Sequence, residues 1–321
     1  MAKIVLAIGT SHGPTIQTPP EEWRRLGEGD TRDPRYDYNA LLKRARPGLD
    51  QEITLDKQQQ RYEAAHSALG HLKEQIQAAK PSVMLVVSNA HQIRPDDNHA
   101  VFSVYRGASL PVALHTGPFD PDARFRPDAE RPKPTLTEKP AHPALGQYLI
   151  EALIERDFDV ACSDRMPEGS ALDEAFAFPY EWLLDGADLP MVPFQLSRYL
   201  PYQATPARCH AMGGALREAV EAWPAGERVM LVASGGLSHQ IIDEELDRRV
   251  IEGLEKGDRD NLTTLPRERL NGAPGTPEIL NWVTVSAAMA PKTMRLVDYL
   301  PCYRSLAGTG HALTFGYWEG R

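Results

Sequence analysis

The stretch Val229–Gln240 constrains the fold of this chain more than any other. It opens with a short apolar run rich in branched residues, Val229–Ala233, and continues through paired glycines to Ser238 and His239. This pattern is typical of a buried strand that ends in a loop. Binding sites in open α/β sheets form at the C-terminal ends of strands, and histidine titrates near neutral pH. His239 is therefore a candidate catalytic residue, with packing at a strand–helix junction as the alternative.

Two further apolar runs end in the same way. Ile4–Ile8 leads through Gly-Thr-Ser to His12, and Val83–Val87 leads through Ser-Asn-Ala to His91. The C-terminal ends of strands in such a sheet border a common crevice, where ligands bind. We therefore expect the histidines that follow these three strands to point into one crevice.

An acidic residue stands at the start of a late helix. Thr276 supplies a hydroxyl N-cap, a proline follows at the first helical position, and Glu278 lies in the first turn. A carboxylate there complements the helix dipole by about 0.3–1 kcal/mol. Two imidazoles and one carboxylate are also the ligand set of non-heme Fe(II) oxygenases. The spacing of the histidines does not say which two of them would bind such a metal.

The composition excludes several classes of protein. The chain has 321 residues and a formal net charge of −9, without a cluster of lysine and arginine, which argues against binding nucleic acid. The three cysteines are far apart and form no Cys-x-x-Cys pair, so neither a disulfide framework nor a thiolate zinc site is expected. The apolar N-terminal run is too short for a signal peptide or a membrane span, so we expect a cytoplasmic protein without a membrane partner.

Periodicity and breakers predict the remaining elements. Apolar residues at three- and four-residue steps indicate a long helix over Thr54–Ala79, ended by a proline. Gly107–Pro140 is rich in proline, glycine and charge and is expected to be irregular, whereas Thr15–Asp50 is expected to form surface loops around a short helix at Tyr38–Ala45. Further helices are expected over Pro143–Arg156, Pro206–Trp223 and Ile241–Lys256, and further strands over Val101–Tyr105, Val160–Ala161, Pro190–Leu196, Arg295–Leu300 and Leu313–Trp318.

Five stretches together resemble a known enzyme family. The Gly-Gly-Leu-Ser-His segment with the acidic helix behind it is the most specific of them. The chain is similar to class III extradiol ring-cleaving dioxygenases, the family of the protocatechuate 4,5-dioxygenase catalytic subunit. It resembles most the single-chain branch typified by 3-O-methylgallate 3,4-dioxygenase. The matching stretches are Ile8–Pro14, Pro19–Trp23, Ala233–Asp247, Gly275–Trp282 and Asp298–Gly310.

The resemblance implies a cofactor, a substrate class and a role for four residues. Fe(II) is the cofactor, and a small aromatic diol and O2 are the partners in the reaction. His12, His91 and Glu278 are the implied metal ligands, and His239 is the implied acid/base histidine. With this resemblance, metal binding becomes the favoured interpretation of Glu278.

Several other residues are candidates for contacts with the substrate or with the histidine. Arginine binds carboxylates through two parallel hydrogen bonds, so Arg198 and Arg304 are candidates for a substrate carboxylate, with surface ion pairing as the alternative. The family often has Asp-His before the pocket loop, where this chain has Asp173 and Glu174. An acid at this position would repel an anionic substrate unless it is protonated or turned away. Finally, Ser238 and Asp243 are candidates for orienting the His239 ring.

The expected fold is α/β, a single domain over residues 1–321 with a central mixed β-sheet flanked by helices. Thr15–Asp50 is long for a connection, which favours a lid or an interface arm. Because the single-chain branch of the family usually self-associates, we expect a homodimer in which residues 15–50 form the arm.

Two other functions remain open at the level of the sequence. One is a zinc-dependent hydrolase on the same scaffold, in which a metal-bound water is the nucleophile. The other is a non-catalytic protein that binds a metal or an aromatic compound, which the acid at Glu174 makes conceivable. Metal analysis, oxygen uptake and catechol binding distinguish these from an iron-dependent dioxygenase.

Overall fold

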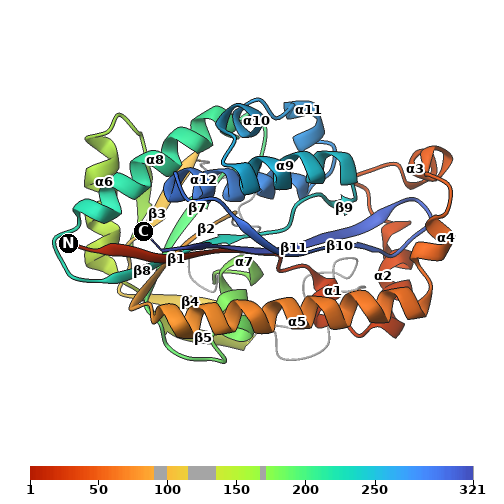
Figure 1. Cartoon of the computed structure of the whole chain (residues 1–321), viewed down its shortest axis with the longest axis horizontal. Helices are drawn as coiled ribbons and strands as arrows, with labels where there is room; N and C mark the ends of the chain where they lie inside the picture. Colours follow the sequence, from red (N-terminus) through yellow and green to blue (C-terminus); the bar gives the residue numbers. More distant parts are fainter. Residues whose placement is uncertain (90–99, 115–134, 167–170, 321) are drawn as a thin grey trace.

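A long mixed sheet forms the centre of the protein (Figure 1). The computed structural model describes residues 1–89, 100–114, 135–166 and 171–320. Within these ranges, nine strands form the sheet and a separate hairpin pairs β4 (Ser109–Leu114) with β5 (Thr135–Pro140). The nine strands are β1 (Lys3–Thr10), β2 (Val83–Ser88), β3 (Phe102–Tyr105), β6 (Ala161–Ser163), β7 (Met191–Leu196), β8 (Arg228–Ser234), β9 (His239–Ile241), β10 (Arg295–Tyr303) and β11 (Thr309–Glu319).

The strand order sets which chain segments meet at the site. It runs β10-β11-β1-β8-β2-β7-β3-β6, with β9 paired to β11. The central strands β1, β8, β2 and β7 are mutually parallel, whereas β11 is antiparallel to β1, β9 and β10. Thr10 pairs with Ser234 at the ends of β1 and β8. The loops that follow these two strands therefore leave the sheet side by side.

Helices cover both faces of the sheet (Figure 1). Because both faces are covered, the parallel strands are apolar throughout rather than alternating with polar residues. In β8, Leu231 faces the core under α8 and α12, while Val232 faces the core under α5. One face carries α6 (Pro143–Ile154), α8 (Pro206–Ala222), α9 (Glu244–Lys256), α10 (Arg259–Thr263), α11 (Arg267–Leu270) and α12 (Ile279–Met289), and the other carries α1 (Pro14–Gln17), α2 (Trp23–Asp30), α5 (Leu55–Ala79) and α7 (Glu174–Phe178).

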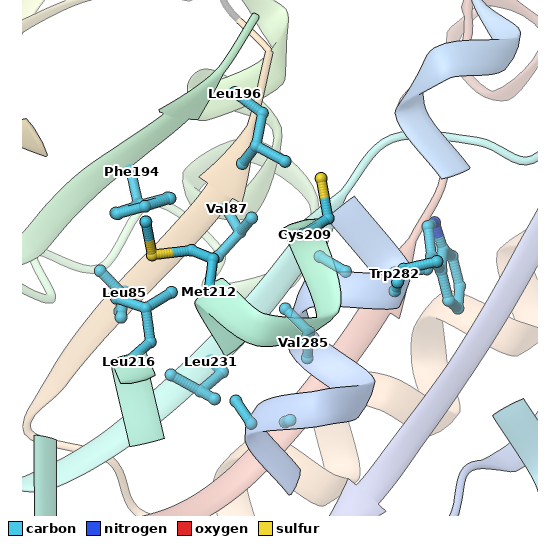
Figure 2. Close-up of a cluster of buried hydrophobic side chains, with 14 of the residues drawn as sticks. Leu85, Val87, Phe194, Leu196, Cys209, Met212, Leu216, Leu231, Trp282 and Val285 are labelled. Atoms are coloured by element: carbon cyan, nitrogen blue, oxygen red, sulfur yellow. The ribbon is translucent and has the colours of Figure 1, made fainter. Parts of the chain in front are cut away.

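A buried hydrophobic core lies between the sheet and the helices α8 and α12 (Figure 2). Met212 and Leu216 of α8 lie over the strand residues Leu85, Phe194 and Leu231, and all five are buried. Such close packing resists changes of side-chain volume. The helix that bears Glu278 at its start is thus seated on a rigid surface.

Most elements predicted from the sequence are confirmed, including the α/β fold with a mixed sheet. The long helix α5 ends where a proline follows at position 81, and its buried stripe contains Ala65, Leu69, Leu72 and Ile76. All predicted strands are present with small shifts at their ends. The helix predicted from position 241 begins instead at Glu244, since the residues before it pair with β11 as β9.

Three predictions about local structure are wrong. The region 107–140 contains the β4–β5 hairpin rather than only irregular chain, because both strands contain a proline and β5 is mostly polar, which masked the strand pattern. Residues 14–30 are mostly helical and packed inward, with Trp23 fully buried, whereas short helices α3 (Tyr38–Arg44) and α4 (Leu49–Glu52) follow further out. Thr276 does not cap the helix by its side chain, since Gly275 holds the N-cap position of a 3-10 turn, Thr276–Glu278, that precedes α12.

The homodimer and its arm at residues 15–50 stay predictions, which the molar mass in solution would decide. No helix in the part of the chain that the structure describes is both long enough and apolar enough to cross a bilayer.

Replacing Gly9 by alanine should destabilise the protein. A methyl group on Gly9 would overlap the buried ring of Trp282, and such overpacking costs about 1–3 kcal/mol. Gly70 in α5 is the matched control, because a methyl group there meets open space. Gly70→Ala should instead raise the free energy of unfolding by about 0.5–1 kcal/mol. Urea unfolding of both variants measures these changes, and a shift of the same sign in both would contradict the packing.

Candidate active site

A cavity of about 250 Å³ opens where the loops after β1 and β8 meet the start of α12. His12 comes from the first loop, Gly236 from the second, His239 from the start of β9 that follows it, and Glu278 from the turn before α12. These elements are far apart in the sequence and adjacent in the sheet. His12, His239 and Glu278, predicted as site residues, thus line one cavity. His91 lies outside the residues that the structure describes.

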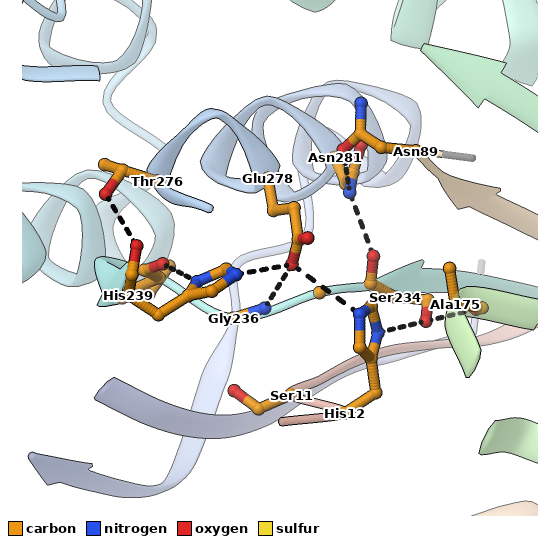
Figure 3. Close-up of polar contacts among 12 residues, drawn as sticks. Ser11, His12, Asn89, Ala175, Ser234, Gly236, His239, Thr276, Glu278 and Asn281 are labelled. Carbon is orange, nitrogen blue, oxygen red and sulfur yellow. Dashed lines mark hydrogen bonds and ion pairs between the residues drawn. The ribbon is translucent and has the colours of Figure 1, made fainter. Parts of the chain in front are cut away.

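Glu278 is the centre of this cluster (Figure 3). Its side chain is fully buried, and its Oε2 accepts a hydrogen bond from the backbone N–H of Gly236 at 3.0 Å. The same oxygen lies 3.8 Å from Nε2 of His12 and 3.4 Å from Nε2 of His239. Burying a carboxylate is costly unless positive charge or hydrogen bonds compensate it. Imidazole nitrogens and a carboxylate oxygen this close together are donor types that bind metal cations.

The hydrogen bonds of His12 define which ring nitrogen carries its proton. Ser234 donates its single hydroxyl hydrogen to the carbonyl oxygen of Ala175 at 2.6 Å. Its oxygen then accepts from Nδ1 of His12, 3.1 Å away. The lone pair of the neutral His12 ring is thus on Nε2, toward Glu278. A metal-ligating histidine has this arrangement, since it donates its other ring N–H to a neighbouring group.

His239 is oriented in the same way by the backbone. Its Nδ1 lies 2.8 Å from the carbonyl oxygen of Leu237, and a carbonyl oxygen only accepts. The lone pair of the neutral ring is therefore on Nε2, which faces Glu278. The His239 side chain is 12% exposed, against 5% for His12, so it is the more accessible of the two imidazoles.

Two glycines allow this close approach. Gly235 has φ 141°, a region that favours glycine, and a Cβ there would lie 2.6 Å from Oε2 of Glu278. A Cβ on Gly275 would overlap the ring of His239. The hydroxyl of Thr276 donates to the carbonyl oxygen of His239 at 3.4 Å, which ties the two loops together. Larger residues at either glycine would separate the carboxylate from the imidazoles.

The donor atoms present fit one metal ion. Ligands that each bind at about 2.1 Å are at most about 4.2 Å apart. The 3.8 Å between Nε2 of His12 and Oε2 of Glu278 meets this limit, and both atoms carry lone pairs. Among the described residues, no group of three or more histidine, cysteine and acidic side chains is arranged to hold a metal. His12 and Glu278 are therefore a partial set, to which a further ligand has to be added.

Of the acidic pair before the pocket loop, only Glu174 lines the cavity. Asp173 is buried as the N-cap of α7, where its carboxylate accepts from the backbone N–H of Ala175 at 3.1 Å. Asp173 thus caps the helix that begins at this point, and the substrate contact predicted for it stays a prediction.

The two arginines predicted to bind a substrate carboxylate differ in their surroundings. Arg304 lines the cavity, yet its guanidinium makes two hydrogen bonds to the buried carboxylate of Asp30, at 2.6 and 2.7 Å. Its guanidinium is thus paired with a group of the protein itself, and the substrate contact of Arg304 stays a prediction. Arg198 also lines the cavity and contacts the ring and hydroxyl of Tyr199, and its Nε is buried without a hydrogen-bond partner among the described residues.

Ser238 and Asp243 do not contact the imidazole of His239. The Ser238 hydroxyl donates to Asp247 at 2.6 Å and accepts from the backbone N–H of Asp243. Asp243 caps α9 and pairs with Arg269. Burial raises the pKa of Asp247 to about 6, although the hydrogen bonds from Ser238 oppose this. These residues hold the loop that carries His239, whereas the Leu237 carbonyl orients the ring.

His311 also lines the cavity, and the sequence reasoning missed it. It is buried on β11, with its ring centroid 5.7 Å from that of His239. Burial and the nearby Arg304 guanidinium lower the pKa of His311 well below its usual range. A histidine inside the otherwise apolar run that ends in Trp318 was the available signal. Arg35, paired with Asp33, is a second lining residue that was not predicted.

Comparison with known proteins identifies the family. The model of the catalytic LigB subunit of aromatic ring-opening dioxygenases matches residues 51–313, most of the chain. The chain therefore belongs to this family, as its motifs predicted. The matched region includes His239 and Glu278 and begins after His12, so the placement of His12 rests on the geometry above.

Curated relatives carry names from aromatic ring cleavage. The gallate dioxygenase of Pseudomonas putida is 28% identical over 180 residues, which are 52% of this chain and 52% of that protein. The 2,3-dihydroxyphenylpropionate/2,3-dihydroxicinnamic acid 1,2-dioxygenase of Cupriavidus necator is 32% identical over 118 residues, 34% of this chain and 36% of that protein. The matches thus span about half the length of these relatives or less.

Ser234→Ala should weaken metal binding. It removes the hydroxyl that fixes the His12 ring, and loss of such a partner typically costs about 10–100-fold in metal affinity. Ser88→Ala is the matched control, because that hydroxyl donates only to the backbone oxygen of Ser234, at 2.8 Å. Anaerobic titration with Fe(II) against a competing chelator measures both. Equal affinities in the two variants would show that Ser234 does not orient a ligand.

Proposed function

We propose that this protein is a non-heme Fe(II)-dependent extradiol dioxygenase that cleaves a catechol-type ring, of the gallate or protocatechuate kind, with O2. The observation that carries the proposal is the convergence of the His12 and His239 imidazoles on one buried oxygen of Glu278, in a chain of the LigB family. His12, Glu278 and His91 are the proposed metal ligands, and His239 is the proposed acid/base residue. We place the protein in the cytoplasm as part of the same proposal.

The described residues fit this chemistry. Bound ferrous iron would supply the redox chemistry that lets O2 react with an aromatic diol. Nε2 of His239 carries a lone pair in the neutral ring and faces the cavity, so it accepts the proton of a ring hydroxyl and later returns it. Such proton transfer contributes typically about 10²–10⁴-fold to the rate.

The cavity favours a single ring with an acidic substituent. Its volume of about 250 Å³ is just below the usual range for ligand pockets, which suits a small ligand. Among the described residues, no carboxylate pairs with Arg198, and its guanidinium borders the cavity. Arg198 is therefore the proposed partner of a substrate carboxylate. Glu174 lies on the same cavity and would disfavour a second negative charge.

The proposal predicts that one variant loses turnover but keeps the metal, whereas another loses the metal. His239→Gln should retain Fe(II) and lose turnover by about 10²–10⁴-fold, because the proton acceptor is absent. Glu278→Gln should lose Fe(II), because the charged ligand is absent. Metal analysis and oxygen uptake with gallate, protocatechuate and pyrogallol after anaerobic reconstitution measure both effects.

Other outcomes would point to other functions. Zinc in the purified protein, with no oxygen uptake after loading with iron, would favour a hydrolase. Tight catechol binding by the iron-loaded protein, without turnover on exposure to air, would favour a binding protein. Either result would overturn the dioxygenase proposal.

Arg198→Met should discriminate between substrates that differ only in a carboxylate. KM for gallate should rise roughly 10- to 100-fold, since a hydrogen bond to a charged group contributes about 1.5–3 kcal/mol. KM for pyrogallol, the same ring without the carboxylate, should change little and is the internal control. A parallel rise for both compounds would assign Arg198 a structural role instead.

A further inference from the structure

The cavity contains a third imidazole that the chemistry above does not use. His311 belongs to β11, which pairs with both β1 and β9 (Figure 1), and it lies opposite His239 in the register with β9. Its ring lies beside that of His239, with 5.7 Å between the centroids and 30° between the planes. It is 6% exposed. The tautomer of the His311 ring determines whether its Nε2 presents a hydrogen or a lone pair to the cavity.

The contact with Arg304 determines the tautomer of His311. Nη1 of Arg304 lies 3.3 Å from Nδ1 of His311. A guanidinium has hydrogens to donate and no lone pair to accept with, so Nδ1 of His311 is the acceptor. The single N–H of the neutral ring is then on Nε2. A charged ring is disfavoured in addition, because it would place two cations against each other in a buried site.

Arg304 is itself held in place by a second buried group. Asp30, at the end of α2, is fully buried and accepts from Nε and Nη2 of Arg304. The hydroxyl of Thr309 also donates to Asp30, at 2.5 Å. This paired geometry compensates the charge and fixes the guanidinium plane. Asp30 of α2 therefore fixes the Arg304 guanidinium, and this guanidinium in turn determines the tautomer of His311.

The N–H of His311 is directed to the cavity rather than to the protein. No described residue accepts a hydrogen bond from its Nε2, and this atom is not among the buried atoms left without a partner. Gly13 lies against this edge of the ring, where a Cβ would come within 2.9 Å of Cδ2. This donor is accessible from the cavity, so once a bound molecule displaces the water there, the donor loses free energy unless that molecule accepts its hydrogen.

We propose that His311 contacts the substrate directly, donating a hydrogen bond from Nε2–H to an oxygen of the bound diol, and that Arg304 and Asp30 are positioning residues that fix this tautomer. The proposal rests on the proposed function for the identity of the acceptor. His239 and His311 then have opposite tautomers side by side: one presents a lone pair to take a proton, the other a hydrogen to stabilise the oxygen that has lost one.

The tautomer is tested on metal-free protein, independently of catalysis. Histidine labelled with 15N gives ring correlations in 1H–15N NMR spectra, and His311→Gln assigns the signals of position 311 by their loss. We expect a single tautomer with the proton on Nε2 and a bare Nδ1. A proton on Nδ1, or a charged ring at neutral pH, would overturn the proposal.

The substrate contact is tested by anaerobic calorimetry of gallate binding to the iron-loaded protein. His311→Leu should bind gallate roughly 10- to 100-fold more weakly, the range for a hydrogen bond to an ionised group. His311→Gln keeps an N–H donor near the position of Nε2 and should bind close to the wild type. Equal loss in both variants, or none, would overturn the contact. Absence of gallate binding by the wild type would overturn the proposed function as well, whereas the NMR result would still decide the tautomer.

Discussion

The parallel pairing of β1 with β8 is the constraint on which the site depends. Thr10 is opposite Ser234 in this register, so the two loops that follow begin at the same level. This is why the hydroxyl of Ser234 reaches the ring of His12 although 222 residues separate them. A slip of one residue would turn Ser234 to the other face of the sheet. The register of β1 against β8 therefore also determines which ring nitrogen of His12 carries the proton.

Two fully buried carboxylates are compensated in different ways, and the difference explains their roles. Asp30 accepts two hydrogen bonds from the Arg304 guanidinium, which neutralises its charge within the protein. Glu278 accepts from the backbone N–H of Gly236 and faces Nε2 of both His12 and His239. Asp30 is therefore held in an ion pair with Arg304, whereas Glu278 lines the cavity beside two imidazoles.

Three neighbouring imidazoles acquire distinct roles from three kinds of partner. A serine hydroxyl places the proton of His12 on Nδ1, and a backbone carbonyl does the same for His239. A guanidinium has the opposite effect on His311. The ring nitrogens that face the cavity therefore differ in kind although the side chains are identical. Partner groups outside the cavity, rather than the histidines themselves, specify what the cavity offers to a bound molecule.

The sequence by itself determined the strands around Val83–Val87 and Val229–Ala233, because strands buried on both faces are uniformly apolar, and it determined the family through the motifs around His239 and Glu278. It did not determine the partners of the polar side chains. Arg304, a candidate for binding a substrate carboxylate, pairs with Asp30, 274 residues away, which no local motif indicated. Apolar periodicity and local motifs are properties of short stretches, so the sequence contains them. Which charges pair, and which ring nitrogen keeps its proton, depends on distances across the fold, so only the tertiary structure decided them.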